Sequence, residues 1–344
     1  MRGAVLSFSR QGAELGRRIT ALLGDQGIEA DFYTTPKYIE QQGDLVIEGG
    51  LSRLMEELFA KVGLVVFVGS CGIAVRGIAP CLKSKVHDPA VLAIDDQANF
   101  VISLVSGHIG GANRYARQLA EALGATAVIT TATDINARFS VDAWATEQGL
   151  HIDSLKAVKE ISAVILERDV GLQSDFAVKG ALPSGVKLSD SGDIGICISS
   201  FRKAPFDTTL LLVPKVLHIG IGCRRGTSLR AIEEAVKQVL KDYKLHPRAI
   251  KAVASIDLKQ DEVGLLAFIE KYQYQSVFYS AQELATVQGE FASSSFVQEV
   301  TTVDNVCERS AVLSAGGGRL LVKKTASSGV TVAVAEESWQ LDFA

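Results

Sequence analysis

The segment from Phe100 to Asp134 constrains the fold of this 344-residue chain more than any other part of the sequence. It opens with an apolar run, Phe100 to Val105, whose β-branched residues are typical of a buried strand. A glycine-rich turn follows, and from Gly111 to Leu123 apolar residues recur at the spacing of a helix that covers a sheet. The run from Thr126 to Ile129 predicts another strand. We therefore expect a βαβ unit whose polar loops follow the strands' carboxyl ends, where open α/β sheets bind ligands.

The turn inside this unit has the residues of an anion site. Gly107, Gly110 and Gly111 let the backbone approach a bound group, and the start of the helix offers unpaired N–H donors. No Lys-Ser or Lys-Thr pair follows, which excludes a P-loop, and the glycine spacing does not fit the dinucleotide fingerprint. His108 lies inside the turn. The alternative interpretation is that the glycines only form a tight turn and that His108 caps a backbone carbonyl.

A second unit of the same kind comes earlier in the chain. The apolar run from Gly63 to Gly69 is typical of a strand that is covered on both faces. It leads into a glycine-rich turn with Gly72, and Arg76 follows one helical turn later. Arg76 is either a ligand for an anion or one partner of an ordinary surface salt bridge.

A third unit begins near residue 216. A strand from Val216 to Ile221 runs into a turn that contains Gly222, Cys223, Arg224, Arg225 and Thr227, and a helix is predicted from Ser228 to Leu240. Two adjacent arginines suit a carboxylate or a phosphate. Thr227 is the predicted N-cap. Cys223 is either a nucleophile whose thiolate Arg224 stabilises or simply a small turn residue.

These units predict an α/β, multi-domain fold with open, mostly parallel sheets flanked by helices and Gly-rich strand-to-helix turns. We expect an N-terminal α/β domain at 1–145, a small central linking domain at 146–214 and a C-terminal α/β domain at 215–344. In the central part we expect one helix, 155–166, and two strands, 194–199 and 209–213.

Composition limits the environment and the partners. The five cysteines are scattered without C-x-x-C spacing, which argues against a disulfide framework and against a structural zinc site, and fits a reducing cytosol. A net charge of −4 argues against broad affinity for nucleic acid. No segment has eighteen uninterrupted apolar residues, so we expect a cytoplasmic protein without a membrane segment.

Six segments together resemble the cobalt-precorrin-5A hydrolases of the anaerobic cobalamin pathway. They are VGSCGIAVRGIAP (68–80), KVHDPAVLAID (85–95), SGHIGGAN (106–113), TTATD (130–134), GIGCRRGT (220–227) and VCERSAVL (306–313). The resemblance implies that the chain opens the ring-A δ-lactone of cobalt-precorrin-5A and releases acetaldehyde, leaving cobalt-precorrin-5B. It also implies a macrocyclic substrate that carries the cobalt itself, so no cofactor and no metal site of the protein are expected. Neighbouring enzymes of the pathway are candidate partners.

A corrinoid intermediate carries many carboxylate arms, which arginines and helix starts can bind. The residues expected to bind it are Gly72, Arg76, Gly107, Gly110, Gly111, Asn113, Arg114, Thr131, Asp134, Gly222, Cys223, Arg224, Arg225 and Thr227.

For lactone opening, His108 is the predicted general base, because a histidine titrates near neutral pH. The amides of Gly110 and Gly111 are the predicted oxyanion donors. Glu308 is the second candidate base. Further candidates are Asp88, Asp134 and His87.

Two other functions stay open at this point. The glycine turns could bind the phosphates of a nucleotide in a transferase or dehydrogenase. Alternatively, the chain could carry corrinoid intermediates between enzymes without changing them, and would then bind substrate and product but form no aldehyde.

Overall fold

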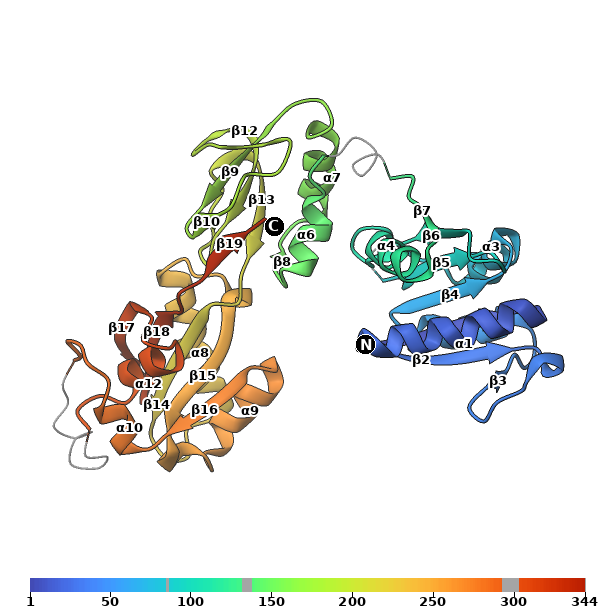
Figure 1. Cartoon of the computed structure of the whole chain (residues 1–344). Helices are drawn as coiled ribbons and strands as arrows, with labels where there is room; N and C mark the ends of the chain where they lie inside the picture. Colours follow the sequence, from blue (N-terminus) through green and yellow to red (C-terminus); the bar gives the residue numbers. More distant parts are fainter. Residues whose placement is uncertain (85–86, 132–137, 293–302, 344) are drawn as a thin grey trace. The chain divides into compact units, whose positions relative to one another are not determined.

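The computed structural model describes residues 1–84, 87–131, 138–292 and 303–343 (Figure 1). The chain divides into two compact units, Met1–Trp144 and Ala145–Ala344. Their sheets are mostly parallel and flanked by helices, so the predicted α/β class is confirmed. The finer division into domains at 145 and 214 stays a prediction.

The first unit is built on a seven-stranded sheet with the order β3-β2-β1-β4-β5-β6-β7. Its strands are β1 (Arg2–Ser7), β2 (Glu29–Thr34), β3 (Leu45–Val46), β4 (Leu64–Val68), β5 (Ala90–Ile94), β6 (Phe100–Val105) and β7 (Thr126–Val128). Its helices are α1 (Arg10–Asp25), α2 (Leu51–Phe59), α3 (Cys71–Ile78), α4 (Ala112–Leu123) and the start of α6 (Val141–Glu147), with short 3-10 turns at Pro36–Tyr38 and Ala79–Cys81.

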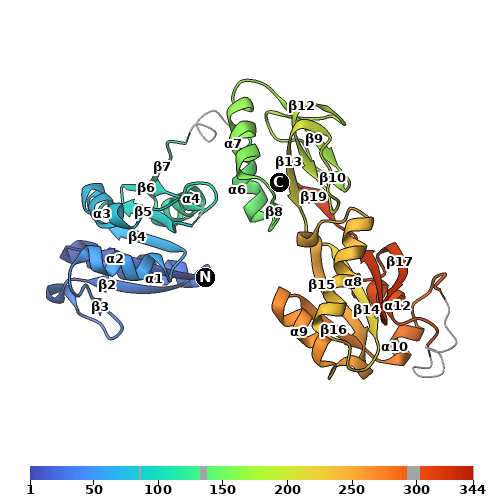
Figure 2. The ribbon, with the colours of Figure 1, turned by 180° about the vertical axis from the view of Figure 1, so that it is seen from behind.

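Both faces of this sheet are covered, because alternate strand residues belong to two separate cores. On one face Val5 packs with apolar residues of α1 and α4. On the other face Ala4 and Leu6 pack with apolar residues of α2 and α3. Figure 1 shows α1 lying over the sheet, and Figure 2 brings α2 on the other face into view.

The direction of the strands changes within this sheet. β1 to β5 run parallel to their neighbours, β6 pairs antiparallel with β5, and β7 pairs parallel with β6. The predicted βαβ unit therefore exists, but it points the opposite way to the rest of the sheet. Its turn therefore lies at the edge where β1, β4 and β5 begin.

The second unit contains two five-stranded sheets. One has the order β11-β9-β12-β13-β8, and the other has the order β16-β15-β14-β18-β17. The first comprises β8 (His151–Ile152), β9 (Val170–Ser174), β11 (Val186–Leu188), β12 (Gly192–Ile198) and β13 (Phe206–Val213), with α7 (Leu155–Val164) against it. The second comprises β14 (Leu217–Cys223), β15 (Ile250–Ile256), β16 (Gln275–Tyr279), β17 (Arg319–Ser327) and β18 (Val330–Glu336).

Helices α8 (Leu229–Asp242), α9 (Val263–Tyr272), α10 (Ala281–Ala285) and α12 (Cys307–Ser314) accompany the second sheet, with 3-10 turns at Pro247–Ala249 and Asp257–Lys259. Near the end of the chain β19 (Gln340–Asp342) pairs with β10 (Ala177–Lys179), so the last residues return to the central part of the unit. The sequence did not predict β9, β10 or β11, which are three to five residues long and lie among glycines and a proline.

Candidate functional site

The turn between β6 and α4 holds His108 in a tight loop. The N–H of Gly111 donates to the carbonyl of His108 at 2.9 Å, and Gly111 has a φ of +82°, which favours glycine. A methyl group at Gly110 would lie 2.4 Å from Cβ of Ser106, closer than real atoms approach. The glycines at these two positions are thus needed by the shape of the turn itself.

Asp142 lies beside His108. Oδ1 of Asp142 is 3.4 Å from Nδ1 of His108, and the two side chains are 4% and 20% exposed. Ser140 Oγ and the N–H of Ala143 donate to the same carboxylate oxygen at 3.2 and 3.1 Å, which fixes its position. A carboxylate at Nδ1 favours the tautomer with the proton on Nδ1, which leaves the lone pair of Nε2 to accept a proton. Sequence reasoning missed Asp142, because only the fold brings the start of α6 to this turn.

The backbone donors of the turn differ from those predicted. The Gly111 N–H already donates to His108, so it is not available to an oxyanion. Within the described part of the chain, the N–H groups of Ile109 and Gly110 have no acceptor. These two amides are therefore candidate oxyanion donors of the loop.

Asn113 and Thr131 form a hydrogen bond that supports the turn. Asn113 is 4% exposed, accepts a hydrogen bond from Ser103 Oγ at 2.7 Å and donates to Thr131 Oγ1 at 2.9 Å. A methyl group at Gly107 would lie 2.8 Å from Oδ1 of Asn113. These contacts give Gly107, Asn113 and Thr131 a supporting role, whereas Asp134 lies outside the described residues.

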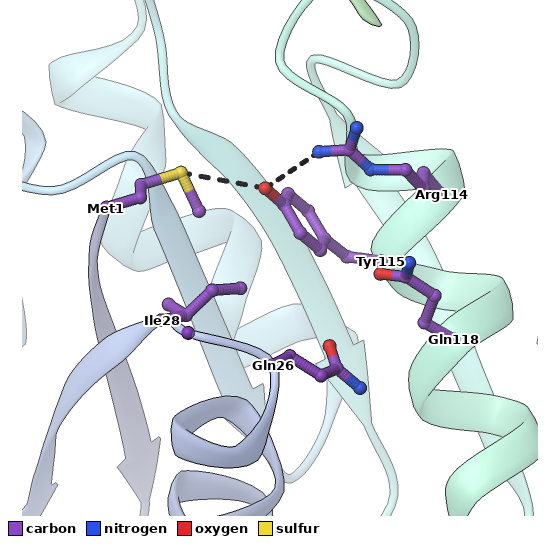
Figure 3. A pocket seen from close by; sticks show the side chains of 7 residues that line it. Met1, Gln26, Ile28, Arg114, Tyr115 and Gln118 are labelled. Atoms are coloured by element: carbon purple, nitrogen blue, oxygen red, sulfur yellow. Dashed lines mark hydrogen bonds between the residues drawn. The ribbon is translucent and has the colours of Figure 1, made fainter.

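Arg114 lies on the first turn of α4 and reaches a pocket beside the loop. Its guanidinium stacks over the ring of Tyr115, with Cζ 4.8 Å from the ring centre, and Nη2 donates to the Tyr115 hydroxyl at 2.9 Å (Figure 3). The pocket has a volume of about 330 Å³, and a Cβ added at Gly111 would lie 3.4 Å from Nη2 of Arg114 and 3.3 Å from Cε2 of Tyr115.

The turn with Gly72 and Arg76 belongs to a different part of the first unit. It follows β4 and therefore lies at the sheet edge opposite to His108. Arg76 is exposed, and its Nη1 lies 3.8 Å from the position of a Cβ on Gly72. The structure does not bring these residues to the His108 turn.

In the second unit, the end of β14 packs against the neighbouring strand β18. A methyl group at Gly222 would lie 2.6 Å from Oγ1 of Thr331, so the small residue is required by packing. Burial raises the pKa of the Cys223 thiol, the main cause being the loss of solvation. A raised pKa favours the protonated thiol, which supports the interpretation of Cys223 as a small turn residue.

Carboxylates of the chain itself already accept hydrogen bonds from two donors of this turn. Arg225 donates to Asp261 at 2.5 Å, and both side chains are exposed. The N–H of Gly226 donates to Glu262, which is 3% exposed, at 2.8 Å. The predicted anion site is thus partly occupied by two acidic residues of the chain itself.

Arg224 and Thr227 complete the turn. Arg224 is exposed, with its aliphatic stem over Gly329. Thr227 donates its hydroxyl to the carbonyl of Arg224 at 2.7 Å, and Ser228 caps α8 by accepting from the N–H of Ala231. The predicted N-cap at Thr227 is therefore wrong by one residue. Arg224 is the better candidate of the two arginines for an external carboxylate.

Glu308 is a buried carboxylate with three fixed donors. It is fully buried and accepts hydrogen bonds from the N–H of Ala292 at 2.9 Å, the N–H of Lys324 at 2.5 Å and the amide of Asn305 at 2.9 Å. Its oxygens therefore link the segments around Ala292, Asn305 and Lys324. Its environment favours a structural role over that of a base.

The remaining candidate bases are not equivalent. Asp88 is 9% exposed and accepts twice from the N–H of Lys83, at 3.0 and 3.1 Å, which is the pattern of a structural cap. His87 is exposed. Only His108 combines partial burial with a carboxylate partner and nearby N–H donors.

One cluster of the second unit resembles a metal site in composition. The ligand atoms of His151, Asp153 and His246 lie within 4.8 Å of one another. However, Nδ1 of His246 accepts from the N–H of Arg248 at 3.2 Å, and Nε2 lies 3.2 Å from Asp153. The Nε2 proton therefore points at the carboxylate, whereas a metal-bound histidine needs that lone pair and donates from its other nitrogen. The geometry is that of a hydrogen-bonded link between β8 and the loop after α8.

Two family profiles match the chain. The profile described as "Cobalamin synthesis G N-terminal" matches residues 53–134, and "Cobalamin synthesis G C-terminus" matches residues 217–335. A cobalt-precorrin-5A hydrolase of Priestia megaterium is 33% identical, with 96% of this chain and 94% of the relative covered. The chain belongs to the cobalt-precorrin-5A hydrolase family.

A second curated relative and a solved structure are also similar to this chain. The hydrolase of Salmonella typhimurium is 32% identical over 96% of both chains. A crystal structure of a cobalamin biosynthesis protein G homologue from Sulfolobus solfataricus is 22% identical, with 97% of this chain and 96% of that chain covered and a TM-score of 0.44. Among the described helices of this family member, none is long and apolar enough to cross a membrane.

Proposed function

We propose that the chain hydrolyses the ring-A δ-lactone of cobalt-precorrin-5A and releases the two-carbon fragment as acetaldehyde, giving cobalt-precorrin-5B. The observation that carries the proposal is the 33% identity over nearly the whole chain to a relative named for this substrate. The His108–Asp142 pair supports it independently, since lactone hydrolysis needs a base near neutral pH.

In the proposed mechanism His108 Nε2 takes a proton from water, and the resulting hydroxide oxygen attacks the lactone carbonyl. Asp142 stabilises the imidazolium that forms, because a buried carboxylate beside Nδ1 interacts strongly with its charge. In this proposal the N–H groups of Ile109 and Gly110 donate to the tetrahedral oxyanion.

Collapse of the tetrahedral intermediate breaks the ring C–O bond, and the proton held by His108 can pass to the leaving alkoxide. The products of this step are a carboxylate and a free hydroxyl. When that hydroxyl loses its proton, its C–C bond breaks, the conjugated ring accepts the bonding electrons, and acetaldehyde leaves. The cobalt is part of the substrate throughout.

The direct test is anaerobic incubation of the purified protein with cobalt-precorrin-5A, with acetaldehyde trapped as a hydrazone. We expect stoichiometric aldehyde from the wild type. The His108→Asn variant should lose roughly a hundredfold to ten-thousandfold in rate, because that is the usual contribution of a general base.

The matched comparison is His87→Asn, which removes the exposed histidine of the same unit. Full activity in His87→Asn with a loss in His108→Asn supports the proposed base, and the reverse pattern would assign the base to His87. Binding of lactone and opened product without any aldehyde would replace the hydrolase by a carrier.

A further inference from the structure

Ser106 joins β6 to the His108 turn in a backbone conformation that serine rarely adopts. Its φ is +58°, in the left-handed region, where any residue other than glycine is strained. Ser106 is 7% exposed, so protein encloses its side chain. Residues held in sparsely populated backbone regions cluster at functional sites, and they persist only where the surrounding structure fixes them. A contact that fixes Ser106 is therefore expected.

The hydroxyl of Ser106 makes such a contact. Its Oγ donates to the carbonyl oxygen of Asp88 at 2.9 Å. Asp88 is itself fixed, because its N–H donates to the carbonyl of Ser84 at 2.9 Å and its carboxylate accepts twice from the N–H of Lys83. The hydroxyl of Ser106 thus links the turn to a hydrogen-bonded segment that precedes β5.

Ser106 also contacts the loop that contains the candidate oxyanion donors. A Cβ added at Gly110 would lie 2.4 Å from Cβ of Ser106 and 2.8 Å from its carbonyl oxygen, so the backbone of Gly110 lies directly against Ser106. The same carbonyl accepts from the N–H of Ala112 at 3.1 Å, where α4 begins. Ser106 therefore closes the loop around Ile109 and Gly110, and its position constrains the direction of their N–H groups.

We propose that Ser106 is a positioning residue for lactone opening. Its hydrogen bond to Asp88 holds the left-handed bend, and the bend keeps the N–H groups of Ile109 and Gly110 directed at the oxyanion. The inference rests on the proposed function. Glycine at this position would adopt the same φ without strain but could not bind the Asp88 carbonyl, so the hydroxyl is the group that the reaction requires.

The test is Ser106→Gly, which removes the hydroxyl and relaxes the backbone at the same time. Relief of the left-handed strain offsets the lost hydrogen bond, so we expect a melting temperature close to that of the wild type. The kcat for acetaldehyde release should fall roughly tenfold to a hundredfold with KM changed little, because misplaced oxyanion donors affect the transition state more than the bound substrate. A normal kcat in Ser106→Gly would overturn the proposal.

Ser106→Ala keeps the carbon that contacts Gly110 and removes only the hydroxyl. It should lose kcat to the same extent as Ser106→Gly and should melt at a lower temperature, because alanine in a left-handed conformation is strained. A kcat loss in Ser106→Gly that is absent from Ser106→Ala would assign the effect to Cβ rather than to the hydroxyl, and would also overturn the proposal.

The matched control is Ser328→Gly. Ser328 is exposed, lies between β17 and β18 and also has a left-handed backbone, with a φ of +49°. The same substitution there should leave kcat and KM unchanged. Equal losses of kcat in Ser328→Gly and Ser106→Gly would contradict a specific role of Ser106.

Amide hydrogen exchange of the ligand-free protein separates this inference from the proposed function. The N–H groups of Gly111 and Ala112 donate to the carbonyls of His108 and Ser106, so their exchange reports whether the turn stays closed. In Ser106→Gly we expect both to exchange roughly twofold to tenfold faster, the effect of losing one neutral hydrogen bond.

Unaltered exchange in Ser106→Gly would reject the anchoring of the turn, whether or not the wild type releases acetaldehyde. Faster exchange in Ser106→Gly together with a wild type that releases no acetaldehyde would reject the proposed function and support the anchoring by Ser106.

Discussion

Two buried carboxylates of this chain have opposite environments. Asp142 shares one oxygen between Ser140, Ala143 and the ring of His108, whose side chain is 20% exposed. Glu308 is surrounded by three N–H donors, two from backbone and one from Asn305. The first can affect a reaction through His108, whereas the hydrogen bonds of the second link separate segments of the chain.

Replacing Asp142 by Asn should therefore impair chemistry more than folding. The amide cannot stabilise the imidazolium that forms during lactone opening, so we expect kcat to fall roughly tenfold to a thousandfold, with KM nearly unchanged. Steady-state acetaldehyde release measures both. A raised KM with a normal kcat would mean that Asp142 only shapes the substrate site.

Glu308→Gln should show the reverse pattern. The new NH₂ group would face N–H donors, and the charged hydrogen bonds to Ala292 and Lys324 would weaken. We expect the free energy of unfolding to fall by roughly 2–4 kcal/mol in urea titrations. Loss of turnover without loss of stability would restore Glu308 as a candidate base.

At the scale of helices and strands, the apolar patterns were sufficient to place elements along the chain. Residues 100–105 form β6, and the helix predicted from Gly111 begins one residue later, at Ala112. The apolar pattern does not predict the direction of a strand, because alternation and β-branching are the same whichever way a strand runs. The sequence thus predicted the turn around His108 but not the edge of the sheet on which it lies.

The sequence also did not predict which residues of the candidate site contact one another. Nothing near Gly226 in sequence indicates that its N–H binds Glu262, 36 residues away. Similarly, only the fold brings Asp142 to His108. The sequence could identify the residue types suited to the chemistry. Whether such a residue already forms a hydrogen bond with another part of the chain depends on long-range packing.

The glycines of two elements give a test of packing at this scale. A methyl group at Gly220 in β14 would lie 1.8 Å from the carbonyl oxygen of Cys307, so α12 approaches the strand at backbone distance. Gly220→Ala should therefore separate α12 from the sheet and destabilise the protein by roughly 3 kcal/mol or more, as overpacking does.

The matched variant is Gly24→Ala in the last turn of α1, where a methyl group would meet nothing within 4 Å. Here alanine should stabilise by roughly 0.4–1 kcal/mol, because it lowers the entropy of the unfolded chain. Thermal unfolding of both variants checks the pair, and equal effects would contradict the close approach of α12.

For the whole molecule, we expect acid to act on histidines of the second compact unit. The second unit contains His151, His218 and His246, and burial lowers the pKa of each of them below the ordinary value of 6.5. Nδ1 of His218 lies 2.7 Å from Oγ of Ser314, and Nε2 lies 3.0 Å from Glu337. The native state therefore holds these rings neutral.

Because their pKa values are lower in the folded than in the unfolded state, the unfolded chain binds more protons below about pH 6.5. The stability linked to these rings is complete above that pH and is lost as the pH falls towards the folded values. We expect the second unit to lose stability as the pH falls below about 6.5, with a slope of up to about 1.4 kcal/mol per pH unit for each histidine. Urea titrations of the full chain at several pH values would measure this slope.

His218→Gln and His246→Gln should each reduce the slope even though they lower stability at pH 7, whereas the exposed His87→Gln should leave it unchanged. An unchanged slope in His218→Gln and His246→Gln would show that acid acts on other groups.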